Sequence, residues 1–333
     1  MSGQDGWEAL GLGNEHVFVI GCERSGTTPL VRLLGAHPNI ALGMERYKFI
    51  LREMRTQRSP ELLTPAHFER DRFLDFRPTD TNLVPPRFAE FYARIEQRFD
   101  AGTITWAGDK VLPPDTFTTL ALANHFPGAR FVFTFRDLLR VASSFDVRAQ
   151  DPEDPDWPAR NDHEIAYRHW VEALDATDAL VAKVGVERVF LVRPRRLYQR
   201  NGEMYRAMFA FLGLDTDPSV DAQFEGLCAK WHGRQEKPLV LDEPTQRSLL
   251  ARIDQAQLRR YHDRAEDQLV AADAGDRRHR RAHARKVADF ESAAIAHAAE
   301  VAERRRQTRH RTKALARTAA RDDERTTGAV RPS

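Results

Sequence analysis

The feature that most constrains this 333-residue chain is the loop at residues 21–28, with the sequence GCERSGTT. The apolar run VFVI at 17–20 precedes it and has the length of a buried parallel strand. Leucines at 30, 33 and 34 follow with helical spacing. A strand, a glycine loop and a helix in this order predict a phosphate cradle, because loop N–H groups and the helix N-terminus face the anion.

The loop differs at one position from the nucleotide-triphosphate pattern G-x-x-x-x-G-K-[ST]. Gly21 and Gly26 have the right spacing, but Thr27 stands where that pattern has the lysine that reaches the terminal phosphates. The nearest cation is Arg24, inside the loop. We therefore predict a phosphate-bearing donor that is not an ordinary triphosphate. The alternatives are a tight turn without a ligand and a nucleotide kinase or NTPase with a degenerate loop.

The stretch from residue 24 to residue 28, RSGTT, resembles the 5′-phosphosulfate loop of sulfotransferases that use 3′-phosphoadenosine 5′-phosphosulfate (PAPS). It is closest to the tyrosylprotein and bacterial branches, which carry arginine where cytosolic enzymes have lysine. The likeness continues without a gap to Glu45, which falls on the catalytic glutamate of the tyrosylprotein branch. It covers residues 16–145 well and 186–214 loosely. The resemblance implies an enzyme, a PAPS-dependent sulfotransferase, that needs no metal.

Sulfuryl transfer requires a base for the acceptor proton and cations for the charge on the departing phosphate. The resemblance implies that Glu45 is the base and that Lys110 and Arg24 stabilise the charge. Val111, Leu112 and Pro113 stand where cytosolic relatives have a catalytic histidine, which favours the glutamate mechanism. The alternatives are a surface glutamate paired with Arg46 or Arg52, and an exposed lysine at a strand end.

The same resemblance supplies a clamp for the donor. Arg136 and Ser144, eight residues apart, match the pair that holds the donor's 3′-phosphate, and a guanidinium fork suits a phosphate dianion. Tyr198 matches a tyrosine beside the nucleotide. A capping Arg-Asp pair at a helix start is the alternative for Arg136. The predicted donor-binding residues are Arg24, Ser25, Gly26, Thr27, Thr28, Arg136, Ser144 and Tyr198.

Further apolar runs predict strands at 103–110, with Asp109 and Lys110 at a polar tip, at 131–135 and at 189–192. Helical spacing lies between them. We expect a P-loop-like three-layer α/β fold: a central parallel sheet with helices on both faces, plus a C-terminal helical extension. Ligands bind beyond the carboxyl ends of parallel strands, so the loop, Lys110 and Arg136 should meet there. Residues 59–86, rich in Pro, Asp and Arg, read as an irregular acceptor-binding wall or a plain surface loop.

Charge divides the chain into a predicted PAPS-binding domain at 1–244 and a basic helical tail at 245–333. The tail has 21 Lys/Arg and 13 Asp/Glu, a net of +8; the chain has 51 and 49, which leaves 30 and 36 for the body, a net of −6. We expect a helix break at Gly275. The tail could be a solvated helix pair, a homo-oligomer contact or a docking scaffold; nucleic acid is disfavoured because acids interleave with the arginines.

The remaining composition bounds location and partners. Only Cys22 and Cys228 are present, so no disulfide framework or zinc pattern is expected, and Cys22 reads as a small loop filler or an oxidisable thiol. We recognise no signal peptide or membrane-length apolar run, which predicts a cytoplasmic protein. The acceptor is expected to be a hydroxyl or an amine of a small molecule, a sugar or a glycolipid.

Overall fold

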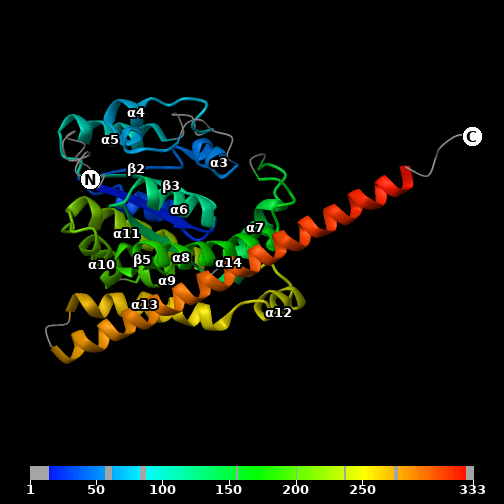
Figure 1. Cartoon of the computed structure of the whole chain (residues 1–333). Helices are drawn as coiled ribbons and strands as arrows, with labels where there is room; N and C mark the ends of the chain where they lie inside the picture. The colour runs from blue at the N-terminus through cyan, green and yellow to red at the C-terminus, as the bar shows by residue number, and fades with distance from the viewer. Residues whose placement is uncertain are drawn as a thin grey trace, which may run out of the picture.

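A computed structural model describes residues 15–56, 62–82, 88–154, 157–199, 201–235, 238–273 and 277–327. Its centre is a five-stranded sheet in the order β2-β3-β1-β4-β5, and every neighbouring pair is parallel (Figure 1). The strands are β1 (Glu15–Gly21), β2 (Ile40–Gly43), β3 (Trp106–Val111), β4 (Arg130–Thr134) and β5 (Val189–Val192). The predicted α/β fold with a central parallel sheet is confirmed.

The crossover connections run from the centre of the sheet toward both of its edges, and this arrangement produces three layers. The crossover through α2 runs from β1 toward β2, whereas the crossovers from β3 to β4 and β4 to β5 run the other way. Right-handed crossovers in opposite directions put their helices on opposite faces. Helix α2 packs on β1, β2 and β3 and also contacts α11. Helix α8 packs against both α6 and α7.

Helices occupy the segments between the strands, where helical spacing predicted them. Asp115 begins α6 by accepting a hydrogen bond from the Thr118 amide. The segment predicted to be irregular contains η1 and α4 within its described part, residues 62–82. The helices of the body are α2 (Thr27–Leu34), α3 (Lys48–Thr56), η1 (Pro65–Phe68), α4 (Arg70–Leu74), α5 (Ala89–Asp100), α6 (Thr116–His125), α7 (Leu138–Ala149), α8 (His163–Val184), η3 (Val186–Arg188), α9 (Pro194–Leu197), α10 (Glu203–Phe211) and α11 (Pro218–Gln235).

Strand β3 corrects one prediction. Asp109 and Lys110 do not form a polar tip beyond the strand; they lie inside it, paired in register with Phe18 and Val19 of β1. Their exposed fractions are 0% and 4%. The sequence suggests a strand end there because charged side chains are rarely buried without partners. These two have partners on distant segments, described below.

The C-terminal extension is helical: α12 (Glu243–Ala251), α13 (Gln255–Asp273) and α14 (Arg277–Thr327). The division between 244 and 245 falls in the first turn of α12. Helix α13 packs on β5 and α14 packs on α8, and the far end of α14 projects from the body (Figure 1). The predicted break at Gly275 lies outside the described residues.

A buried polar cluster joins this extension to the body. Asp178 of α8 accepts hydrogen bonds from Gln257 at 2.9 Å, Arg260 at 2.6 Å and Tyr261 at 3.0 Å, all on α13. Buried polar groups are stabilising only when they are satisfied, and this carboxylate has three donors. His297 of α14 adds a contact to Asp175 at 3.0 Å. Part of the extension is therefore anchored to the body rather than solvated on all sides.

Candidate functional site

The carboxyl ends of the strands bring the predicted residues together at one edge of the sheet, because all five strands run in the same direction. The loop follows β1, Glu45 follows β2, Lys110 lies near the end of β3 and Arg136 follows β4. Residues separated by more than a hundred positions meet there, as the hydrogen bonds below show. The predicted gathering point of loop, lysine and arginine is confirmed.

The loop has the backbone of an anion cradle. Gly26 has φ of 96° and Arg24 has φ of 65°, both in the left-handed region. Gly21 sits so close to β4 that a Cβ there would lie 2.5 Å from the Thr134 carbonyl oxygen. Helix α2 begins at Thr27, so the N–H groups of Thr27 and Thr28 have no intrahelical acceptor and are available to an anion, whereas the Leu30 N–H already donates to the Gly26 carbonyl.

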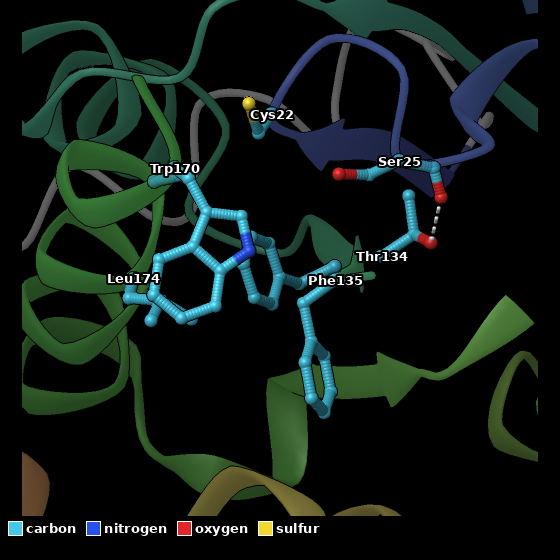
Figure 2. A pocket seen from close by; sticks show the side chains of 8 residues that line it. Cys22, Ser25, Thr134, Phe135, Trp170 and Leu174 are labelled. Atoms are coloured by element: carbon cyan, nitrogen blue, oxygen red, sulfur yellow. Dashed lines mark hydrogen bonds between the residues drawn. The ribbon is translucent and has the colours of Figure 1, made fainter. Parts of the chain in front are cut away.

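The backbone of Ser25 makes two hydrogen bonds that fix the conformation of the loop. Its N–H donates to the Cys22 carbonyl at 3.2 Å, and its own carbonyl accepts from Thr134 Oγ1 at 3.2 Å (Figure 2). Its hydroxyl points toward a gap beside Trp170 that has no room for a water molecule. Among the described residues no group hydrogen-bonds that hydroxyl. Contact of the Ser25 side chain with a donor therefore stays a prediction.

Cys22 lies in the same enclosed region, close to Trp170 in Figure 2. The thiol is buried, with an exposed fraction of 2%. Burial and the neighbouring Glu23 carboxylate raise the pKa of the Cys22 thiol well above its ordinary value. A thiol that stays protonated is a poor nucleophile, so the structure favours the loop-filler interpretation of Cys22 over the oxidisable one.

Lys110 connects the loop to Glu45. Its ammonium donates to Thr28 Oγ1 at 3.0 Å and lies 2.8 Å from Glu45 Oε1. The lysine side chain is only 5% exposed, and that of Glu45 is 20% exposed. Lys110 is therefore not the exposed strand-end lysine of the alternative interpretation. Glu45 is not paired with Arg46 or Arg52 either, because it faces Lys110 and, at 3.8 Å, Lys48.

Glu45 has an unusual backbone. Its φ is 58°, and it and Arg24 are the two non-glycine residues with positive φ among those that the structure describes. A non-glycine residue in this region costs about 1–3 kcal/mol and is concentrated at functional sites. Both strained residues were predicted as site residues from the sequence. The Glu45 carbonyl is fixed by a hydrogen bond from Thr81 Oγ1 at 3.0 Å.

The predicted clamp residues adjoin the loop on its other side. Arg24 Nε donates to Ser144 Oγ at 2.8 Å, and Arg136 Nη1 donates to the Arg24 carbonyl at 3.3 Å. The Arg136 guanidinium lies 5.1 Å from the ring centre of Trp231. Tyr198 is buried and lies 4.9 Å from that same ring. Tyr198 is thus one aromatic ring removed from Arg136.

Two further residues near the site make contacts that the sequence did not predict. His169 Nδ1 of α8 contacts Glu23 Oε2 of the loop at 3.0 Å. Although burial opposes it, the hydrogen bond and charge of Glu23 raise the pKa of His169 above its ordinary value. The second is Asp109, whose carboxylate is buried beneath Glu45. Both act through contacts between segments far apart in sequence, which local patterns do not encode.

Neither a metal-binding group of side chains nor a membrane-spanning helix is present among the described residues. Within the described ranges, no three His, Cys, Asp or Glu side chains are grouped so that they could hold a metal ion. None of the helices in those ranges is both long and apolar enough to cross a bilayer. The cytoplasmic location stays a prediction.

Comparison with solved structures finds similarity to several sulfotransferases. Among solved structures, the sulfotransferase domain of the Synechococcus PCC 7002 olefin synthase is 19% identical with a TM-score of 0.42, over 62% of this chain and 76% of that chain. Sulfotransferase STF1 of Mycobacterium tuberculosis H37Rv is 18% identical with a TM-score of 0.42, over 67% and 74%. Sulfotransferase STF9 of Mycobacterium avium is 16% identical with a TM-score of 0.38, over 71% and 72%. No protein with a curated description matches the chain.

The family comparison covers the part of the chain that holds the site. The model of the sulfotransferase family matches residues 16–218, which is more than half of the chain and includes the loop, Glu45, Lys110, Arg136 and Ser144. This match does not depend on the distances described above. The chain therefore belongs to the sulfotransferase family and is an enzyme of that kind.

Proposed function

We propose that this enzyme transfers the sulfuryl group of PAPS to a hydroxyl or an amine of a small molecule, a sugar or a glycolipid, with Glu45 as the general base. The observation that carries the proposal is the contact of one buried ammonium, that of Lys110, with both the loop at Thr28 and the carboxylate of Glu45. A base and a cation beside a phosphate cradle are the groups that this chemistry requires.

The donor would bind across the loop. The N–H groups of Thr27 and Thr28 and the hydroxyl of Thr28 suit the 5′-phosphosulfate, with Arg24 as the cation. Arg136 and Ser144 would take the 3′-phosphate, and Tyr198 would support them through Trp231. The fit rests on the left-handed backbone at Gly26 and Arg24 and on the guanidiniums of Arg24 and Arg136. No metal is part of this proposal.

In the transfer step, the acceptor oxygen attacks sulfur and forms a new O–S bond. The bond between sulfur and the bridging oxygen breaks, and its electron pair stays on the departing phosphate. Glu45 takes the acceptor proton, and the Lys110 ammonium stabilises the charge that develops on the leaving oxygen. The products are the sulfated acceptor and 3′,5′-bisphosphoadenosine.

The alternative hypothesis, a nucleotide kinase or NTPase, has less support. Thr27 replaces the lysine that such enzymes use at the terminal phosphates, and the lysine near the loop, Lys110, is paired with Glu45. A domain division near residue 244 and a homo-oligomer formed through α13 and α14 remain proposals. A scaffold role of these helices would not require the cluster around Lys110, so that cluster favours catalysis.

Donor binding gives the first prediction. The bisphosphate product should raise the melting temperature of the protein more than ATP or AMP does at equal concentration, because a ligand stabilises the state that binds it and the clamp requires a 3′-phosphate. Calorimetric titration with the three nucleotides measures the same preference. An ATP affinity equal to that of the bisphosphate would support the kinase reading instead.

Arg136→Ala tests the clamp within this experiment. Loss of a charged hydrogen-bond partner of phosphate costs about 1.5–3 kcal/mol, or roughly a 10- to 100-fold weaker bisphosphate affinity. Arg148→Ala is the matched control, since Arg148 lies on the same helix as Ser144 but pairs with Asp154 at 2.5 Å. Equal affinities of the two variants would show that Arg136 does not bind the nucleotide.

A further inference from the structure

The turn that contains Glu45, residues 44–47, is hydrogen-bonded to the buried carboxylate of Asp109. Asp109 is fully buried, and its two oxygens accept three backbone hydrogen bonds. Oδ1 accepts from the Arg46 amide at 2.9 Å and from its own neighbour Lys110 at 2.8 Å, and Oδ2 accepts from the Tyr47 amide at 2.9 Å. One side chain thus joins the residues after Glu45 to the strand that holds Lys110.

We propose that Asp109 is a positioning residue that fixes Glu45 in its left-handed conformation and thereby aims the carboxylate at Lys110 and the loop. The proposal rests on the proposed role of Glu45 as the base. Asp109 would not touch the acceptor or the donor, because its carboxylate is enclosed. It acts through the backbone of the turn.

The close fit at Gly43 supports this role. A Cβ at Gly43 would lie 2.6 Å from Asp109 Oδ1 and 2.7 Å from the Arg46 Cβ, too close for any side chain. Glycine therefore allows the carboxylate to reach the amides of the turn. The amide of Met44 is also fixed, by a hydrogen bond of 3.0 Å to the Tyr92 hydroxyl.

A second anchor holds the same turn from the other side. Arg46 is 0% exposed; it pairs with Asp80 at 2.9 Å and donates to the Phe73 carbonyl at 2.9 Å. Its guanidinium lies 4.3 Å from the ring centre of Phe76. The side chain of Arg46 thus points away from Glu45 into the segment at 62–82. Glu45 is left as the residue of the turn that faces Lys110.

The ionised carboxylate of Asp109 lowers the free energy of unfolding, so stability alone does not explain its presence. Burial raises the pKa of its carboxyl to about 6, and the three amides only partly offset that effect. A raised pKa means that the ionised form opposes folding: the cost is absent below the unfolded-state pKa and fully present above about pH 6. A charge retained against this cost is expected at a functional site.

The test is a double-mutant cycle of Asp109→Asn and Glu45→Gln, read as the rate at which radiolabelled sulfur moves from PAPS into components of a host-cell extract. An asparagine would turn an N–H₂ donor toward one of the three amides and push the turn away. Displacement of a reacting group by about 1 Å costs up to roughly 100-fold in rate. We expect Asp109→Asn to slow transfer 10- to 100-fold with unchanged affinity for the bisphosphate.

The cycle separates this inference from the proposed function. If Asp109 acts through Glu45, adding Asp109→Asn to Glu45→Gln should slow transfer by less than about twofold. A full additional loss in the double variant would overturn the positioning role and leave the base intact. A wild-type rate in Asp109→Asn would overturn it as well. A wild-type rate in Glu45→Gln would reject the base itself, and the positioning role with it.

Two controls exclude a general loss of structure. Asp178→Asn also removes a fully buried carboxylate, but one that anchors α13, so it should lower stability and leave the transfer rate per folded molecule unchanged. In wild type, the amide proton shifts of Arg46, Tyr47 and Lys110 should titrate together near pH 6, and Asp109→Asn should abolish that titration. Equal rate losses in Asp109→Asn and Asp178→Asn would contradict the proposal.

Discussion

Glu45→Gln should lower turnover by about two to four powers of ten, the usual contribution of a general base, while bisphosphate affinity stays near that of wild type. Glutamine keeps the shape and polarity of the side chain but does not accept a proton at neutral pH. Glu45 contacts Lys110 rather than the loop itself, so the donor loses no direct partner. Steady-state rates and calorimetry with the bisphosphate measure the two quantities.

Arg24→Ala is the matched comparison for this variant. Arg24 belongs to the loop and its side chain donates to Ser144, so its loss should weaken donor binding and slow turnover together. Misfolding would reduce both quantities in both variants. If Glu45→Gln transfers sulfuryl groups to an acceptor at close to the wild-type rate, the base lies elsewhere.

Lys110→Met should lower turnover about 100- to 1,000-fold, the typical cost of removing one donor that stabilises a developing oxyanion. Methionine fills much of the same buried volume without the charge. Unlike Glu45→Gln, this variant should also weaken bisphosphate affinity, because Lys110 donates to Thr28 of the loop. Turnover and calorimetric affinity should therefore fall together.

Lys48→Met is the control for charge alone. The Lys48 ammonium is also near Glu45, at 3.8 Å, but its side chain is 38% exposed and the contact is long. Exposed pairs of this kind contribute little, so we expect a change in rate of less than about threefold. Equal losses in the two lysine variants would mean that net charge near Glu45, rather than the position of Lys110, determines the rate.

The sequence was sufficient for the framework of the fold because its signals are local. Strands β1, β4 and β5 are short apolar runs followed by polar or glycine residues, and each lies within a residue or two of its predicted ends. Strand β2 has only four residues, IALG, and two of these are Ala and Gly. Nothing in its composition indicates a strand; it forms because β3 provides a parallel neighbour.

The site was predictable where spacing and resemblance carry it, and not where tertiary contacts do. The loop, Glu45, Lys110 and Arg136 were identified from the sequence and lie together. The contacts that support them were not predicted: Asp109 was interpreted as the polar end of a strand, and no role was assigned to His169 or Trp231. Their contacts are made with residues distant in the sequence, such as Arg46 for Asp109, 63 positions away.

The C-terminal extension shows the same limit. Its charge left a solvated helix pair and a contact or docking helix as alternatives; in the structure Tyr261 and Phe290 are buried, and Gln268 bonds both the amide and the carbonyl of Leu191 in β5. A helix rich in charge still has one apolar face, and the body determines whether that face is covered. Beyond Val301 the side chains described, up to residue 312, are exposed.

The decisive measurement for Glu45-dependent sulfuryl transfer is the movement of radiolabelled sulfur from PAPS to an acceptor. The enzyme is incubated with the labelled donor and a host-cell extract, and labelled products are separated and identified by mass. We predict a sulfated small molecule, sugar or glycolipid, formed together with 3′,5′-bisphosphoadenosine and lost when Glu45→Gln replaces wild type. If the wild-type enzyme binds the bisphosphate but moves no label to any component, PAPS is not its sulfuryl donor for these acceptors; if Glu45→Gln moves label equally fast, Glu45 is not the base.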